Sequence, residues 1–339
     1  MKKLVVIGGG FAGSNICRKL ENYFNVTLID EKEYFEFTPG ILRSIIYPKH
    51  LKGVQVNHKD YLKKSKFILG NVSKISENYI FVNKEKIKYD YAVICSGSRY
   101  ESPVKDREIV IASRSKNLIK YKDKLSKSKD VIIIGGGLVG IELVGEIIDR
   151  YNDKNIKIIH SNKRIIYRNN IKSFLYINKF LKKNNVEVIC CERVIRKEKN
   201  ELITKNNNHF KYDMAFFCTG IKPNSDFIEK KYLDVKGFIK ADKYLRMRDN
   251  IFVCGDVASV NEEKTAQAAE KQSSIIIRNL IAIERNKRLK EYASKERPFS
   301  ISLGLYDGIF EYKNFVITGI IAAFIKKIIE IKTMIKYKI

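Results

Sequence analysis

The 339-residue sequence lacks the features of a membrane-spanning or disulfide-built protein. It has no stretch of about 18 consecutive apolar residues, so we expect no transmembrane helix. Lys2 and Lys3 precede an apolar run, but no small-residue cleavage site follows a long apolar segment, which argues against a signal peptide. The six cysteines show no C-x-x-C or C-x-x-x-x-C spacing, which suits a reducing cytoplasm.

Acidic residues are scarce relative to basic ones, at 38 Asp and Glu against 65 Lys and Arg, and the net charge is +27. This surplus favours anionic partners such as nucleotides, acidic lipid surfaces or nucleic acid. The basic residues are spread along the whole chain, however, as a compositional bias would produce. We therefore do not expect nucleic acid as a partner, and we assign no metal ligands.

The first 30 residues carry the pattern of a dinucleotide-binding unit. An apolar run, Leu4–Ile7, leads into GGGFAG, then a segment with helical spacing, then a second apolar run ending at Asp30. Gly8 allows the tight turn, Gly10 lets the backbone approach a pyrophosphate, and Gly13 lets helix and strand pack closely. Asp30 is placed to accept a hydrogen bond from a ribose hydroxyl. The alternative is a glycine turn with only a structural role.

The same pattern returns 127 residues later, counting from Gly8 to Gly135. The strand-like run Val131–Ile134 precedes GGGLVG, a helix is predicted to about residue 151, and a second strand ends at His160. Two complete units imply two dinucleotides in one chain. Other apolar runs predict strands at 67–75, 79–82, 89–95, 186–191, 201–204, 214–218, 251–254 and 300–303, and helices at 41–46, 116–129 and 266–283.

Seven segments, in order along nearly the whole chain, carry a family resemblance: VVIGGGFAG, YDYAVICSGS, VIIIGGGLVGIELVGEI, KIIHS, FFCTGIKPNS, IFVCGDVA and KTAQAAEKQ. With them the chain resembles the two-dinucleotide-binding flavoprotein family of pyridine-nucleotide oxidoreductases. It is most similar to the type II NADH dehydrogenases and the ferroptosis-suppressor (AIF-like) NAD(P)H:quinone reductases.

The resemblance implies an α/β fold with two Rossmann-like dinucleotide-binding domains, the FAD domain being split by an inserted NAD(P)-binding domain. The expected boundaries are 1–108 for the first part of the FAD domain, 109–225 for the NAD(P)H domain, 226–290 for the second part of the FAD domain, and 291–339 for a C-terminal segment that docks on the membrane and forms the quinone site.

The same resemblance implies the cofactors FAD and NAD(P)H and the residues that bind them. FAD is expected at Gly8, Gly10, Ala12, Gly13, Asp30, Thr38, Pro39, Val72, Ser96, Gly97, Gly255, Asp256 and Ala268. NAD(P)H is expected at Gly135, Gly137, Gly140, Ser161 and Gly220.

Two residues are candidates for the place where nicotinamide, flavin and quinone meet. Glu142 belongs to the GIE run early in the second helix, and Gln267 belongs to the AQAAEKQ run beside the flavin. Each has a purely structural alternative. An acid in a first turn is stabilised by the helix dipole, and the glutamine could cap a helix or lie on the surface.

The end of the second unit lacks the acid that an NAD-specific site usually places there. The strand is followed by His160, Ser161, Asn162, Lys163 and Arg164, so no carboxylate repels a 2′-phosphate. Ser161 with Lys163 or Arg164 could bind that phosphate. We therefore expect NADPH to be accepted at least as well as NADH.

The function expected is an FAD-dependent NAD(P)H dehydrogenase that passes electrons to a quinone. The region at Phe37–Gly40 holds no cysteine, so disulfide-reductase chemistry lacks its nucleophile. Sulfide:quinone reductase is an alternative, and a second is an AIF-like flavoprotein with a binding or signalling role. The expected location is cytoplasmic, peripheral on the inner face of the membrane.

The tail predicts how such an enzyme reaches its quinone. From Ile320 onward an apolar stripe, bordered by lysines, lies opposite a polar stripe on a helical projection. The apolar stripe is Ile321, Phe324, Ile325, Ile328, Ile331 and Ile335, and the polar one is Lys326, Lys327, Glu330 and Thr333. Such a helix lies in a lipid interface and is attracted to anionic headgroups. The alternative is a helix that packs its apolar face on the FAD domain or on a second subunit of a homodimer.

Overall fold

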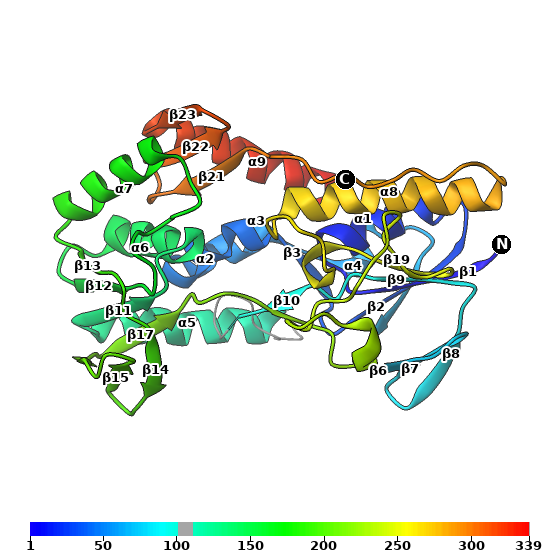
Figure 1. Cartoon of the computed structure of the whole chain (residues 1–339), viewed down its shortest axis with the longest axis horizontal. Helices are drawn as coiled ribbons and strands as arrows, with labels where there is room; N and C mark the ends of the chain where they lie inside the picture. The colour runs from blue at the N-terminus through cyan, green and yellow to red at the C-terminus, as the bar shows by residue number, and fades with distance from the viewer. Residues whose placement is uncertain (101–110, 339) are drawn as a thin grey trace.

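The computed structural model of the chain describes residues 1–100 and 111–338 (Figure 1). The boundary expected between residues 108 and 109 lies outside these residues. The chain forms two parallel sheets at opposite ends of an elongated molecule, with a third group of strands and a long helix along one side (Figure 1).

The larger sheet has the strand order β19-β20-β9-β1-β2-β5, and all neighbouring pairs except β19 with β20 are parallel. In the same order, the strands span Arg246–Arg248, Ile251–Val253, Tyr91–Ile94, Lys3–Ile7, Asn25–Asp30 and Lys66–Leu69. The central strands β1 and β9 are buried on both faces, which explains their continuous apolar sequences. Helices α1 (Phe11–Leu20) and α8 (Ala266–Glu284) pack together beside this sheet (Figure 1).

The smaller sheet repeats the same unit. Its order is β13-β12-β11-β17, all parallel, with bounds Glu187–Ile189, Asn155–Ile159, Asp130–Ile134 and Met214–Phe217. Helices α5 (Ile111–Lys127), α6 (Leu138–Arg150) and α7 (Ile171–Lys183) accompany it. The chain leaves the larger sheet after β9, forms the smaller sheet, and returns for β19 and β20. This confirms the predicted fold class of two Rossmann-like units, one inserted into the other.

Small antiparallel sheets and short helices fill the edges. The sheets pair β3 (Tyr34–Glu36) with β4 (Gln55–Asn57), β6 (Val72–Ile75) with β7 (Tyr79–Val82) and β8 (Glu85–Lys88), β10 (Ser98–Arg99) with β18 (Lys222–Pro223), and β14 (Val194–Lys197) with β15 (Glu201–Thr204) and β16 (His209–Lys211). The short helices are α2 (Ile41–Ile46), α3 (Leu51–Val54), α4 (His58–Tyr61) and the 3₁₀ turns η1 (Thr38–Gly40), η2 (Pro48–His50), η3 (Lys230–Tyr232) and η4 (Gly255–Val257).

The single strand predicted over 67–75 is wrong. It is two strands, β5 and β6, which belong to different sheets and are separated by Gly70 and Asn71. A Cβ atom on Gly70 would lie 2.5 Å from the Asn83 side-chain nitrogen. The glycine therefore lets the chain pass close to Asn83 as it changes sheets, and an apolar run gives no sign of such a change.

A C-terminal sheet and helix complete the fold. Strands β21 (Phe299–Ser302), β22 (Gly308–Tyr312) and β23 (Phe315–Thr318) form an antiparallel sheet, and α9 (Ile320–Lys338) follows. In Figure 1 this helix, in red, runs from the C-terminal sheet towards α8. Near its end the buried Tyr337 ring stacks on Phe35 with 4.0 Å between ring centroids.

Helix α9 packs through its polar stripe and exposes its apolar one. Its buried residues are Ala322, Glu330, Thr333, Met334 and Tyr337. The exposed large side chains are Ile320, Ile321, Phe324, Ile328, Ile331 and Ile335, of which Phe324 is 66% exposed. We call these six residues the outer face of α9. No helix within the described ranges has the length and apolar character needed to cross a bilayer.

Candidate functional site

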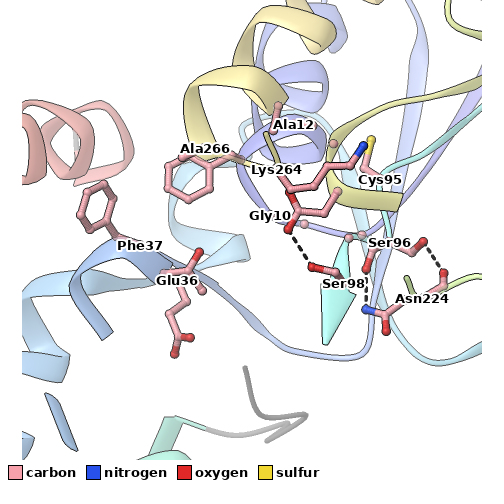
Figure 2. Close-up of a pocket in the computed structure, with 18 of the residues that line it drawn as sticks. Gly10, Ala12, Glu36, Phe37, Cys95, Ser96, Ser98, Asn224, Lys264 and Ala266 are labelled. Atoms are coloured by element: carbon pink, nitrogen blue, oxygen red, sulfur yellow. Dashed lines mark hydrogen bonds between the residues drawn. The ribbon is translucent and has the colours of Figure 1, made fainter. Parts of the chain in front are cut away.

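A cavity of about 530 Å³ opens at the carboxyl ends of the parallel strands of the larger sheet (Figure 2). Ile7 at the end of β1, Asp30 at the end of β2 and Cys95 after β9 all line it. Ligands of open parallel sheets bind in this kind of crevice, outside the carboxyl ends of the strands.

The first glycine loop forms one wall of the cavity. Gly8 has a φ of +98°, a conformation that favours glycine. A Cβ on Gly13 would lie 1.8 Å from the Gly8 carbonyl oxygen, so Gly13 allows α1 to pack on the loop. At Gly10 no described atom lies within 4 Å of the Cβ position. Gly10 is the N-cap of α1 and offers no capping side chain. The first N–H groups of α1 therefore suit a phosphate.

Asp30 is fixed by the same loop. One carboxylate oxygen, Oδ2, accepts from the Gly9 N–H at 2.5 Å, and the other accepts from the Lys32 N–H at 2.9 Å. Nε2 of the buried His58 lies 3.4 Å from Oδ2. Burial disfavours charge on Asp30, yet His58 and Lys32 hold the pKa of its carboxyl below the usual range. A charged acceptor therefore faces the cavity where the sequence predicts a ribose contact.

Most residues predicted for the FAD site line this one cavity. They are Gly8, Gly10, Ala12, Asp30, Thr38, Pro39, Val72, Ser96, Gly97, Gly255 and Asp256, and the candidates Glu142 and Gln267 line it too. Gly13 and Ala268 do not line it. Gly13 acts through helix packing, and the N–H of the buried Ala268 donates to the Thr265 side chain that caps α8.

The segments after β9 and β20 are tied together around the cavity. Ser98 Oγ donates to Asp256 Oδ2 at 2.7 Å. Ser96 and Asn224 exchange two hydrogen bonds of 2.6 and 2.8 Å, drawn as dashed lines in Figure 2. The Gly255 N–H donates to Oε1 of the buried Gln272 at 2.7 Å. The fold thus holds the Gly255–Asp256 turn against the cavity from both sides.

The second unit reaches the same cavity through the start of α6. Leu138, Val139 and Glu142 line it, although Gly135, Gly137, Gly140, Ser161 and Gly220 do not. Gly135 and Gly140 repeat the packing of the first loop, since a Cβ on Gly140 would lie 2.0 Å from the Gly135 carbonyl oxygen. Gly137 caps α6 without a capping side chain and has no described atom within 4 Å of its Cβ position. Gly220 is likewise open, with a φ of +64°.

Glu142 meets a residue that sequence reasoning missed. Its carboxylate pairs with Lys326 of α9 and accepts from the Ser302 N–H at 3.2 Å. Burial raises the pKa of Glu142 despite the opposing charge of Lys326. The sequence places Lys326 in the polar stripe of the tail, and no local signal shows that this stripe faces the cavity. Other lining residues missed are Ser98, Tyr100, Asn224, Lys264 and Phe299.

A second cavity of about 260 Å³ adjoins the first. The two share Pro39, Leu42 and Lys326 as lining residues. Its other walls include Leu305 and Tyr306, whose side chains are exposed at the surface. This cavity extends from the wall that it shares with the first cavity to the surface at Leu305 and Tyr306.

The second unit has a histidine, His160, after β12, where the first unit has Asp30 at the end of β2. His160 Nδ1 accepts from the Gly136 N–H at 3.1 Å, as Asp30 accepts from Gly9. Burial lowers the pKa of His160, which therefore stays neutral at pH 7. Ser161 and Lys163 are exposed beside it. Arg164 instead donates to the carbonyl oxygens of Tyr167 and Asn169, so of the two basic residues Lys163 is the better candidate for a 2′-phosphate.

The cysteines are not arranged for dithiol chemistry at the flavin. Cys95 and Cys254 lie side by side on β9 and β20, with their sulfur atoms 3.5 Å apart. Both are buried, and burial raises the pKa of Cys95 well above its usual range. The Cys95 carbonyl lies against Gly8 of the first glycine loop. Cys190 and Cys191 follow β13 in the smaller sheet.

The family model for the pyridine nucleotide-disulphide oxidoreductases matches residues 2–273. The chain belongs to this family. Apoptosis-inducing factor homolog A of Dictyostelium discoideum is 30% identical over 91% of this chain and 84% of its own length. Ferroptosis suppressor protein 1 of Taeniopygia guttata is 25% identical over 96% of this chain and 92% of its own. The structure of NDH2 from Plasmodium falciparum in complex with NADH has a TM-score of 0.86 at 16% identity, covering 99% and 96% of the two chains.

Membership of this family confirms the predicted resemblance and the predicted cofactors. The protein is a flavin-dependent NAD(P)H oxidoreductase that uses FAD and NAD(P)H. The uncapped helices and open glycines of both units suit the phosphates of two dinucleotides.

Valine at the two open glycines should separate the roles of the two units. Gly10→Val should lose most of its bound FAD, whereas Gly137→Val should stay yellow but no longer be reduced by NAD(P)H, because each side chain fills the space of a phosphate. Absorbance at purification and anaerobic titration measure both. Gly13→Val, which meets the Gly8 carbonyl, should instead unfold the first unit. Equal loss of FAD in both open-glycine variants would refute the assignment.

The strand end of the second unit generates a prediction on nucleotide choice. NADPH should be used at least as efficiently as NADH, and Lys163→Glu should raise the KM for NADPH about tenfold or more, because a hydrogen bond to a charged group contributes about 1.5–3 kcal/mol. The KM for NADH should change little, and Lys172→Glu, on the nearby helix α7, serves as the control. A kcat/KM that strongly favours NADH in the wild type would contradict this prediction.

Proposed function

We propose that the protein is an FAD-dependent NAD(P)H:quinone oxidoreductase that works at a membrane surface on the cytoplasmic side. FAD, when bound, would supply the two-electron chemistry that links NAD(P)H to the quinone. The protein places the two rings in contact, and no side chain needs to act as a nucleophile. The roles of the individual binding residues, and the domain division at 108, 225 and 290, are part of this proposal.

One observation carries the proposal: helix α9 lines the first cavity with one side and exposes apolar side chains on the other. Its inward side brings Lys326, Ile329 and Thr333 to the first cavity, where Lys326 pairs with Glu142 of α6. Its outer face exposes six large apolar side chains. A contiguous apolar stripe on a soluble surface marks an interaction site. One helix therefore both lines the first cavity and carries the apolar stripe.

The second cavity supports a lipophilic acceptor. It leads from Pro39, Leu42 and Lys326 to the exposed Leu305 and Tyr306, and Ala323 of α9 also lines it. A quinone that leaves a lipid phase along α9 would reach the flavin-side wall through this space. We therefore assign the quinone head group to the second cavity.

The surroundings of the outer face suit a lipid surface with anionic headgroups. Lys327, Lys332, Lys336 and Lys338 are exposed along the same helix. Aliphatic and aromatic side chains bordered by lysines insert at the boundary of headgroups and acyl chains. A subunit interface is the other way to cover this face, and charge substitutions on the outer face separate the two.

Sulfide is a less suitable reductant than NAD(P)H for this site. Sulfide oxidation at a flavin relies on reactive cysteines beside the ring. Among the described residues, Cys95 is the one cysteine that lines the first cavity, and it lies at the glycine-loop end with a raised pKa. The quinone reductase assignment, in contrast, requires no reactive cysteine beside the ring.

The function is tested by the electron donors and acceptors of the purified yellow protein. Under anaerobic conditions NADPH and NADH should each bleach the flavin, sulfide should not, and a short-chain quinone should restore the oxidised spectrum at the steady-state turnover rate. Bleaching by sulfide would favour a sulfide:quinone reductase. Reduction without quinone turnover would favour an AIF-like binding role and refute the proposal.

Charge on the outer face should detach the enzyme from lipid without harming the redox site. The double variant Phe324→Glu with Ile328→Glu should bind anionic vesicles at least about tenfold more weakly, because burying each such side chain contributes about 1.5–3 kcal/mol. Long-tail quinone reduction in vesicles should fall, while FAD content and ferricyanide reduction stay unchanged. Sedimentation with vesicles and steady-state assays measure these effects.

Two controls complete this test. Ile195→Glu with Val235→Glu changes two other exposed apolar side chains, on β14 and in the loop after η3, and should bind vesicles normally. Deleting residues 320–339 is a poor substitute, because it also removes the buried Tyr337 and Lys326. If the double variant instead converts a dimer into a monomer with vesicle binding unchanged, the outer face is a subunit interface.

A further inference from the structure

The inference below rests on the proposed function, quinone reduction. Reducing a quinone requires one proton that the nucleotide does not supply. In the overall reaction NAD(P)H + H⁺ + quinone → NAD(P)⁺ + hydroquinone, the nicotinamide supplies two electrons and one proton. The second oxygen–hydrogen bond of the hydroquinone takes its proton from elsewhere. A titratable side chain that lines the second cavity and also reaches solvent is suited to deliver that proton.

Most polar side chains of the second cavity are held by a fixed partner. Arg43 donates from Nε and Nη2 to the buried Glu146 at 3.0 and 2.9 Å, and also to the Gly304 carbonyl oxygen. Lys326 pairs with Glu142, and Lys327 pairs with Glu330. These cations are poor acids at neutral pH, since their ordinary pKa values lie above about 10.

His50 is the lining residue with suitable acid chemistry. It ends η2, and its Nε2 lies 3.4 Å from Glu330 Oε2. An imidazole is the side chain that exchanges a proton most readily near neutral pH. Although burial opposes it, contacts with His50 and Lys327 lower the pKa of Glu330 to about 2. Glu330 therefore remains a carboxylate that orients the ring.

The surroundings of His50 also allow its ring to regain a proton from solvent. Its side chain is 14% exposed, so the ring touches both the cavity and solvent. The charged groups that share the cavity are Arg43 from α2, Glu146 from α6, and Lys326, Lys327 and Glu330 from α9. Helix α5 also packs on η2, and its buried Arg114 lies 3.4 Å from Glu36.

The other histidines are placed elsewhere. His58 is fully buried between Asp30 and Tyr61, and His160 contacts the second glycine loop. His209 lies on β16 with its side chain 46% exposed, 3.1 Å from Glu201. The sequence contains four histidines, so His50 alone among them lines either cavity.

We propose that His50 is the catalytic acid that protonates the quinone oxygen in the second cavity, with Glu330 as its positioning residue. As the two electrons from NAD(P)H reach the quinone, an O–H bond forms at the quinone oxygen and the N–H bond of the imidazolium breaks. Neutral His50 then takes a proton from solvent. The imidazole is neither oxidised nor reduced, and the charge on Glu330 stays constant.

The test compares an acceptor that needs protons with one that does not. Ferricyanide takes up electrons alone, so its reduction consumes no proton. His50→Gln should lower kcat with a short-chain quinone by about 100-fold, since a positioned general acid contributes roughly 10²–10⁴-fold. The rate of flavin bleaching by NADPH and the kcat with ferricyanide should stay unchanged. His209→Gln, the matched control on β16, should behave as wild type with both acceptors.

A second variant guards against a loss of structure. His50→Ala should show the same selective loss, and added imidazole should restore quinone turnover but leave ferricyanide turnover unchanged. Glu330→Gln should lower quinone turnover less than His50→Gln does, and added imidazole should not rescue it. A solvent isotope effect on quinone turnover should appear in the wild type and be larger in His50→Gln.

The outcomes separate the inference from the proposed function. Unchanged quinone turnover in His50→Gln, or equal loss with quinone and ferricyanide, would overturn the role of His50 while the quinone reductase assignment stands. A wild-type protein that reduces ferricyanide but no quinone would overturn both.

Discussion

A buried ion pair between Glu142 and Lys326 joins the second nucleotide unit to the C-terminal helix. Glu142 lies early in α6, where the second nucleotide unit enters the first cavity, and a carboxylate buried there requires a counter-charge. That charge comes from α9, close to the C-terminal end of the chain. Removing one partner of a buried pair costs about 3–5 kcal/mol, so the pair fixes α9 against α6. The C-terminal segment therefore forms part of the wall of the first cavity.

The two nucleotide units show how one backbone arrangement tolerates different side chains at its most specific position. In each unit the amide of the middle glycine points at the residue that ends or follows the second strand, and it needs an acceptor there. Asp30 offers a carboxylate, and His160 offers a ring nitrogen. Since either satisfies the loop, this residue is free to differ in charge, and the charge determines which ribose substituent is tolerated.

The sequence predicts those parts of the structure that depend on local backbone chemistry. Glycines at fixed spacing after apolar runs identify both loops and their strands, because a tight turn and close helix packing leave few other solutions. Further lining residues of the first cavity, such as Thr38, Pro39 and Asp256, follow only from the family resemblance. Local backbone chemistry does not predict which side of α9 faces inward. Its apolar and polar stripes have equal periodicity, and only tertiary packing decides that Lys326 and Glu330 face inward. His50 is likewise identified only from the structure, because its short turn η2 lines the same cavity as α9.

The orientation of α9 has a geometric consequence that links chemistry to location. A helix is about 10 Å across, so its inward and outward residues are rigidly related. Once Lys326 and Glu330 are required at the two cavities, the opposite stripe, including Phe324 and Ile328, has to face outward. Exposing that stripe to water is unfavourable by roughly 25 cal/mol for each Å² of apolar surface. Under the proposed function, a lipid surface would remove this penalty and would at the same time bring a lipophilic acceptor to the mouth of the second cavity. The inward packing of Lys326 and Glu330 thus also determines which side chains of α9 are exposed.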